Sequence, residues 1–145
     1  MRPRHAGLFH VTSRSNGEEH IFLDDRDYLA VIQILGELVR EGALRCYGFC
    51  FMPTHYRLLA WFDDDMLSRS IHRLNKRYAA GFNRRHGRRG HVFDSPFTSV
   101  EVTKDGHLYR LPDYIAENPP RRPWAFSSYD ARFGFVETLD LIAAA

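Results

Sequence analysis

The stretch ALRCYGFCFMPTHYRLLAWF, residues 43–62, decides the fold. Its two halves, residues 43–52 and 55–62, are rich in the aromatic and aliphatic side chains that are typical of strands. Pro53 and Thr54 separate the halves, and a proline beside a small polar residue favours a tight turn. The sequence therefore predicts a β-hairpin.

The second strand of this hairpin begins with a histidine and has an arginine two residues later. Alternate residues of a strand point to the same face of a sheet. We therefore expect His55 and Arg57 to lie side by side, with Tyr56 turned to the opposite face. An imidazole beside a guanidinium on a half-buried strand marks this face as a candidate site.

The segments around the hairpin complete the order of elements. Residues 8–14 and 96–103 read as strands, and residues 24–42 and 64–86 have apolar side chains at helical spacing. A third helix is predicted over residues 105–118, ended by two prolines. The order strand-helix-strand-strand-helix-strand-helix predicts an α+β, ferredoxin-like (RRM-like) fold. Its four-stranded antiparallel sheet has helices on one face, and the C-terminal helix is an addition.

The length and composition fit one domain over residues 1–145. With 145 residues, 44% of them hydrophobic, the chain is expected to form one core over about residues 8–120 and an aromatic C-terminal wrap over residues 121–145. No apolar run is long enough to span a membrane, and the N-terminus lacks the apolar region of a signal peptide. We expect a cytoplasmic protein.

The two cysteines, Cys46 and Cys50, lie four residues apart on one predicted strand. We expect them to point to the same face, too far apart to form a disulfide easily. A single pair at this spacing is a weak metal signal. Buried free thiols are the preferred interpretation.

Positive charge is concentrated in one segment although the whole chain carries only +2. Residues 66–93 contain eight basic residues and no Asp or Glu, whereas the rest of the chain has an acidic excess. A segment so free of carboxylates indicates binding of a polyanion, and a phosphate backbone is the first candidate. The basic residues are Arg69, Arg73, Lys76, Arg77, Arg84, Arg85, Arg88 and Arg89.

A phenol and an amide share one face of the predicted third helix, because Tyr114 and Asn118 are four residues apart. A tyrosine has a pKa of about 10 and needs a metal ion or a base nearby to attack a phosphodiester well. If Tyr114, Asn118 and His55 converged on one divalent ion, they would form a DNA-nicking site.

Several motifs occur in the order found in a known family. They are FHVTSRSN (9–16), MPTHYRLL (52–59), LSRSIHRLNKRYAAGFNRRHGRRGHVF (67–93), YIAENPPRRP (114–123) and RPWAFSSY (122–129). Each is weak alone, but together they cover nearly the whole chain. The sequence resembles the single-tyrosine HUH transposases, most closely the branch associated with repetitive extragenic palindromes (REP).

This resemblance implies an enzyme that binds a hairpin of single-stranded DNA and cuts beside it, through a 5′-phosphotyrosine intermediate. By position, Tyr114 is the expected nucleophile, and His55 and Asn118 are the expected ligands of Mg²⁺ or Mn²⁺. Arg14 and the basic residues of 66–93 are expected to bind the DNA. Related enzymes include dimers, so a homodimer is one expectation, and the DNA partner places the protein at the nucleoid.

The sequence departs from the family at Arg57, where the HUH pair has its second histidine. Arginine stays protonated and has no lone pair, so it cannot bind a metal. Either Arg57 contacts the scissile phosphate and supports a weaker enzyme, or catalysis is lost and hairpin binding remains. Pro112 adds a second departure: it either kinks a helix that starts at Asp105 or begins a fresh helical segment as its first residue, and the two alternatives give Tyr114 different directions.

An RNA-binding module of the RRM type is a third hypothesis, because it has the same predicted fold. The aromatic RNP1 pattern on a central strand is absent from the sequence, which disfavours it.

Overall fold

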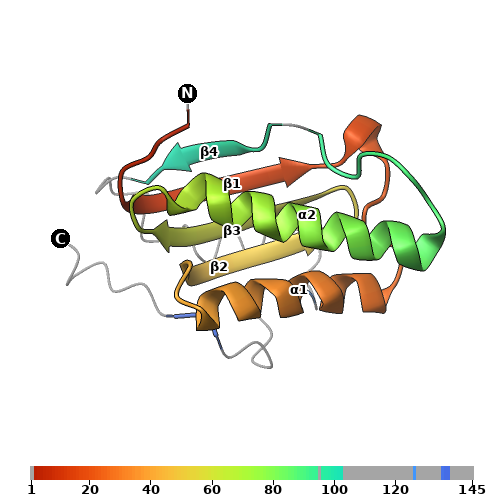
Figure 1. The fold of residues 1–145 in the computed structure, drawn as a ribbon, viewed down its shortest axis with the longest axis horizontal. Coiled ribbons are helices and arrows are strands. Elements are labelled where there is room, and N and C mark those ends of the chain that lie inside the picture. The colour runs from red at the N-terminus through yellow and green to blue at the C-terminus, as the bar shows by residue number, and fades with distance from the viewer. Residues whose placement is uncertain (1, 95, 103–125, 127–134, 138–145) are drawn as a thin grey trace.

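The computed structural model describes residues 2–94, 96–102, 126 and 135–137. Its elements follow the predicted order (Figure 1). They are β1 (Gly7–Arg14), a 3₁₀ turn η1 (Asn16–Glu18), α1 (Asp25–Arg40), β2 (Arg45–Met52), β3 (His55–Phe62), α2 (Met66–His86) and β4 (Thr98–Glu101).

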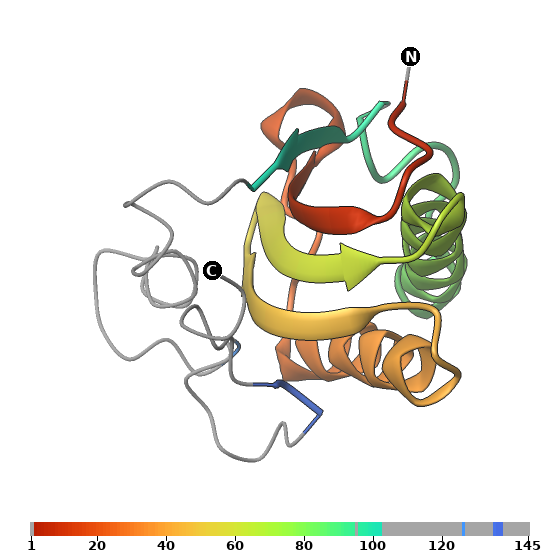
Figure 2. The same cartoon turned by 90° about the vertical axis from the view of Figure 1, so that its left-hand side faces the viewer.

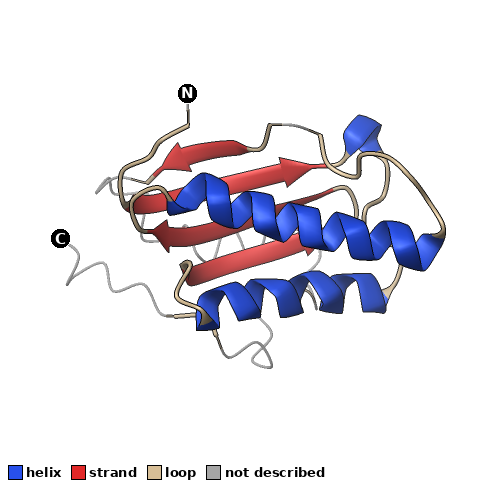
Figure 3. Cartoon of the chain, in the orientation of Figure 1, coloured by secondary structure: helices blue, strands red, loops and turns tan. Residues whose placement is uncertain are grey.

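The four strands form one antiparallel sheet in the order β2-β3-β1-β4. α1 and α2 lie next to each other on one face of this sheet (Figures 2 and 3). Two layers with this strand order are the ferredoxin-like α+β fold. The predicted fold class is confirmed. No helix in the described part of the chain is long and apolar enough to cross a membrane.

Local sequence signals set the ends of both helices. The Asp24 carboxylate accepts a hydrogen bond from the Asp27 amide at 3.0 Å and so caps α1. α2 ends at Gly87, whose φ of +59° lies in the left-handed region that glycine adopts without strain. Fixed ends keep the apolar stripe of each helix aligned with the sheet.

The core lies between the sheet and the two helices. The strands contribute alternate residues, and β3 buries Tyr56, Leu58 and Phe62 fully. The helices contribute side chains at intervals of three or four residues. The fully buried helix residues include Val31, Leu35, Leu38, Ile71 and Leu74.

The cysteine prediction was half wrong. Both thiols are free and buried, as expected. However, a β-bulge between Cys46 and Gly48 shifts the alternation of β2 by one residue. Cys46 therefore packs in the main core under the helices, and Cys50 packs with Leu59 on the opposite face.

Two other predicted boundaries differ in detail. The fourth strand is shorter than residues 96–103, since β4 covers Thr98–Glu101. The predicted turn after β1 is the 3₁₀ turn η1. The predicted third helix lies outside the described residues.

Parts of the predicted C-terminal wrap that the structure describes lie against β2 and α1. The Phe51 amide donates to the Phe126 carbonyl at 3.1 Å, and the Phe126 ring stacks on Tyr28 with centroids 4.4 Å apart. Val136 forms a parallel bridge with Cys46. These contacts cover the outer edge of β2, which would otherwise present unpaired backbone groups.

Candidate nucleic-acid interface

β3 places His55 and Arg57 on the same face of the sheet, opposite α1 and α2. The register pairs His55 with Arg14 and Arg57 with Thr12 on β1. Thr12 is in turn paired with Thr98 on β4. We call this set the far face: His10, Thr12, Arg14, His55, Arg57 and Thr98. His55 and Arg57 therefore lie side by side on this face, as the alternation of β3 predicts.

The histidine and the arginine are both half-buried. His55 Nδ1 lies 3.4 Å from Thr54 Oγ1 in the hairpin turn. This contact orients the ring from its own turn residue. Beside it, Arg57 adds a guanidinium, which matches the geometry of a phosphate.

His10 is a far-face residue that the sequence analysis did not place in the site. It pairs with Leu59 on β3, one row of the sheet from Arg57. Its Nε2 is buried and has no hydrogen-bond partner among the described residues. Burial, and secondly the charge of Arg57, lower the pKa of His10, so the ring is neutral at pH 7. The signal in the sequence for this placement is that His10 comes two residues before Thr12 on one strand, so both side chains point to the same face.

A buried polar chain supports these strands from the helix side. The Tyr56 hydroxyl donates to Asn75 Oδ1 at 2.7 Å, and Asn75 Nδ2 donates to Ser13 Oγ at 3.0 Å. These hydrogen bonds link β3, α2 and β1 directly beneath the far face. Burial raises the pKa of Tyr56, so this phenol stays protonated and is a structural group.

The described residues of the far face do not assemble a metal site. They supply the imidazoles of His55 and His10, with the cationic Arg57 on the strand position between their rows. A guanidinium donates no lone pair and repels a divalent cation. The chemistry of this set fits a phosphate better than Mg²⁺ or Mn²⁺.

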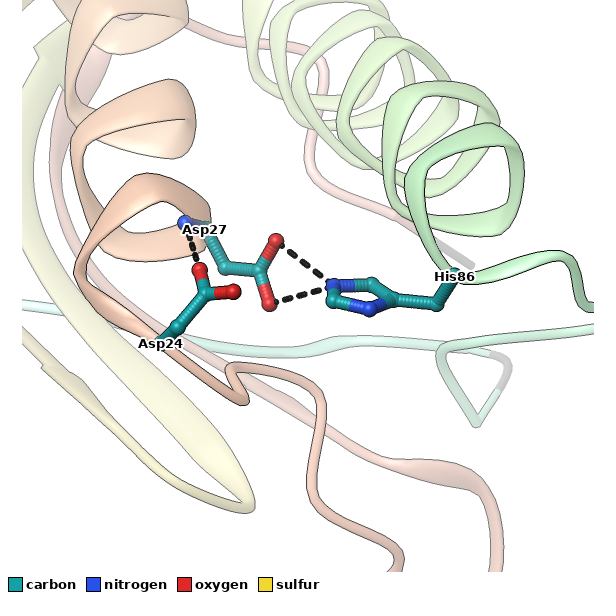
Figure 4. A group of neighbouring side chains, drawn as sticks. All are labelled: Asp24, Asp27 and His86. Carbon is teal, nitrogen blue, oxygen red and sulfur yellow. Dashed lines mark hydrogen bonds and ion pairs between the residues drawn. The ribbon is translucent and has the colours of Figure 1, made fainter.

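One group in the described part of the chain does have metal-ligand spacing, and it lies elsewhere. Ligand atoms of Asp24, Asp27 and His86 lie within 4.8 Å of one another, between the start of α1 and the end of α2 (Figure 4). This spacing would allow the three side chains to bind one divalent ion. Neither Asp24 nor His86 lies on the far face.

The hydrogen bonds of Asp27 argue that this group is a structural ion-pair network. Its fully buried carboxylate accepts from the Leu23 amide at 2.9 Å and from Arg85 Nε at 2.9 Å. His86 Nε2 lies 3.0 and 2.8 Å from the two oxygens. Both oxygens are thus engaged, and one partner is a permanent cation. The network ties the two helices together.

Half of the basic residues in segment 66–93 are bound to carboxylates from the rest of the chain. These ion pairs are Arg73–Glu41, Arg77–Glu37, Arg85–Asp27 and Arg88–Glu19. The others form no ion pair with any residue in the described ranges: Arg69, Lys76, Arg84 and Arg89. The acidic excess outside the segment therefore neutralises part of the predicted DNA-binding surface.

Tyr114, Asn118 and Pro112 lie outside the described residues. The structure describes the His55 side of the predicted nicking site and gives no position for the phenol or the amide. Their roles stay predictions.

The fold and the far face define a ferredoxin-like α+β protein with a His–Arg pair on one side of its sheet and a basic helix on the other. Among solved structures, one described as a REP-associated tyrosine transposase bound to a REP hairpin has this fold, with a TM-score of 0.69. The match has 15% sequence identity and covers 97% of this chain and 90% of that chain. No family model and no curated protein matches the sequence. At this identity the similarity establishes a common fold.

Proposed function

We propose that the protein binds single-stranded DNA folded into a hairpin and contacts the phosphate backbone with Arg57. The observation that carries this proposal is the placement of Arg57 beside His55 on the far face of a fold that is also found in a hairpin-bound transposase. A guanidinium can form two parallel hydrogen bonds to one phosphate. Such a contact needs no metal ion. A DNA substrate also implies action in the cytoplasm, at the nucleoid.

Hairpin binding is tested by measuring affinity over a range of salt concentrations for a DNA hairpin, an unstructured strand of equal length and an RNA hairpin. Arg57→Gln is expected to weaken hairpin binding and to lower the slope of log K against log salt by about 0.7 to 0.9, the value for one lost phosphate contact. Arg26→Gln, on the exposed first turn of α1, is the matched control for charge. Equal effects of both variants would argue against a contact by Arg57. Preference for the RNA hairpin would favour the RRM-type alternative.

Strand cleavage through Tyr114 is the finer part of the proposal, favoured by the ordered motifs of the sequence. The phenolic oxygen of Tyr114 would form a bond to the phosphorus while the bond to the 3′-oxygen breaks. The products would be a 5′-phosphotyrosine and a 3′-hydroxyl, which takes up a proton. The bond energy is kept in the covalent link, so rejoining needs no nucleotide cofactor. If a divalent ion is involved, His55 and Asn118 are the residues proposed to hold it.

Hairpin binding without cleavage is the competing function, and Arg57 in place of a second imidazole is the observation that favours it. A hairpin labelled on the 3′ side of the expected break, incubated with Mn²⁺ and Mg²⁺, separates the two. A covalent adduct that disappears in Tyr114→Phe supports cleavage. An adduct that forms only in Arg57→His shows that the chain has lost one ligand and kept the nucleophile. No adduct in either protein, with hairpin binding intact, leaves binding as the function.

The homodimer expected from the resemblance stays a prediction. Sedimentation of the protein with and without a hairpin would give the subunit number. Mixing Tyr114→Phe with His55→Ala protein would then test whether two chains exchange active-site residues, since restored adduct formation requires such an exchange.

A further inference from the structure

The exposed residues of α2 lie along two flanks that differ in their ion pairs. On the flank beside α1, Arg73 Nη2 lies 2.9 Å from Glu41 Oε2, and Arg77 Nη2 lies 2.6 Å from Glu37 Oε2. A phosphate that approached these arginines would meet the two carboxylates as well. The ion pairs of this flank connect α2 to the neighbouring helix.

On the flank beside β4, no carboxylate of the described residues is bound to an arginine or lysine of α2. The His72 ring packs edge-on against Phe97, just before β4, with centroids 6.1 Å apart. Arg69 and Lys76 stand one turn before and one turn after His72, so all three lie on adjoining turns of one helix side. Arg69 and Lys76 are exposed, and neither forms an ion pair or a hydrogen bond with a residue in the described part of the chain.

A hollow of about 500 Å³ opens at the start of this flank. The N-terminal segment and the first turns of α2 enclose it, with three arginines and a single carboxylate in its wall. Its lining consists of Arg2, Pro3, Arg4, Asp65, Ser68 and Arg69. The Asp65 carboxylate already accepts from Arg4 Nε at 2.7 Å, so the wall keeps a positive excess.

Arg2 is the least satisfied group of this hollow. Its guanidinium lies over the Phe97 ring, 3.6 Å from the centroid, and its Nη2 is buried without a hydrogen-bond partner among the described residues. Burial lowers the pKa of Arg2, although the group remains charged at any ordinary pH. A donor that is withdrawn from water and unpaired gains most from an incoming anion.

We infer that Arg2, Arg69 and Lys76 form a second phosphate-binding surface, the β4 flank, which holds the stem of the same hairpin. This inference rests on the proposed function. β4 is the edge of the sheet, and Arg57 lies two strands inward from it, which is about 10 Å. One nucleic acid that passes over this edge meets Arg57 on one side and the β4 flank on the other. The ligand class is the phosphodiester backbone of paired DNA, read without regard to base sequence.

Two double variants with the same change in charge test this inference: Arg69→Gln/Lys76→Gln on the β4 flank and Arg73→Gln/Arg77→Gln on the α1 flank. Binding of a DNA hairpin with a long stem is measured against salt concentration, and thermal unfolding confirms that both variants are folded. The β4 pair is expected to lower the salt slope by about 1.8, for two lost contacts to duplex phosphates. The α1 pair is expected to change the slope by less than half of that.

Equal slopes for the two variants, or the larger change in the α1 pair, would overturn the inference while leaving hairpin binding established. No hairpin binding by the unmodified protein would instead overturn the proposed function.

Two further measurements sharpen the result. With an unpaired strand as ligand, the β4 pair is expected to match the unmodified protein. Titration with inorganic phosphate is expected to shift the amide resonance of Ser68. Arg2→Gln is expected to raise the phosphate concentration that gives half of this shift at least tenfold.

Discussion

The two faces of the sheet use the same strands for different purposes. On β3, Tyr56 and Leu58 point toward the helices and are fully buried, whereas His55 and Arg57 point to the far face and remain half-buried. The helix side is filled by apolar contacts, whereas the far side presents donors and cations beside a smaller apolar cluster around Cys50 and Leu59. Because the period of a strand is two residues, one strand of eight residues contributes to the core and to the candidate site at once. Stability and binding should therefore be separable by substitutions at adjacent positions.

The largest expected effect comes from a cavity on the helix side. Leu58→Ala should lower the free energy of unfolding by about 2 to 5 kcal/mol, because it removes buried methyl groups from a close-packed core. Thr12→Ala, on the far face, should cost less than about 1 kcal/mol. Urea denaturation of the two variants checks the comparison. If Thr12→Ala were as costly as Leu58→Ala, the far face would be part of the stabilising core.

The buried carboxylate between the helices is expected to rank next. Asp27→Asn should cost about 2 to 3 kcal/mol, since Arg85 and His86 lose their charged acceptor. The amide oxygen of asparagine can still accept from the Leu23 amide. Glu37→Gln, which removes an exposed ion pair with Arg77, is the control and should cost less than about 1 kcal/mol.

Denaturation of both variants, with and without Mg²⁺, also tests the structural interpretation of the Asp27 network. Stabilisation of the unmodified protein by Mg²⁺ that is absent in Asp27→Asn would show a metal site there.

A smaller effect is expected from the polar chain beneath the far face. Tyr56→Phe should cost about 1 kcal/mol, because Asn75 Oδ1 loses its donor in a buried position. Tyr47→Phe is the matched control, as the Tyr47 hydroxyl has no hydrogen bond to a described residue. Thermal unfolding measures the difference. If Tyr56→Phe reduced hairpin binding and left stability unchanged, the hydroxyl would have to act on the far face.

The last effect vanishes at neutral pH and is a loss of stability at alkaline pH. Burial raises the pKa of Cys46 to about 12 in the folded protein, from an ordinary value of 9.0. Between these values the thiol ionises in the unfolded chain and stays protonated in the folded one, so the free energy of unfolding falls as the pH rises above about 9. Below pH 9 the thiol contributes no pH dependence. Cys46→Ala should therefore show a shallower decline between pH 8 and pH 10.5 in urea denaturation. An unchanged decline would mean that the Cys46 thiol is reached by solvent.

The two-stranded hairpin and both long helices could be predicted because their signals are local. Alternation over residues 55–62, apolar spacing over 64–86 and a glycine after each helix all act within a few residues. The bulge in β2 could not be predicted, because it depends on how Cys46 pairs with Ala60 on the neighbouring strand. As a result, the predicted shared face of the two cysteines was wrong.

The candidate site was predicted in part for the same reason. That His55 and Arg57 share a face is a property of any strand. The row formed by Thr98, Thr12 and Arg57 depends on the order of strands that are far apart in the sequence. His10 was therefore overlooked, although it lies one row away.

The sequence by itself determined the elements, their order and a strongly basic second helix, because composition and periodicity are properties of each segment alone. Only the tertiary structure decided which basic side chains of that helix are free to meet a phosphate. The carboxylates that neutralise Arg73 and Arg77 come from α1 and its C-cap residue, more than thirty residues earlier, and packing brings them within 3 Å. Electrostatic energy depends on distance in space, and distance in the chain does not fix it.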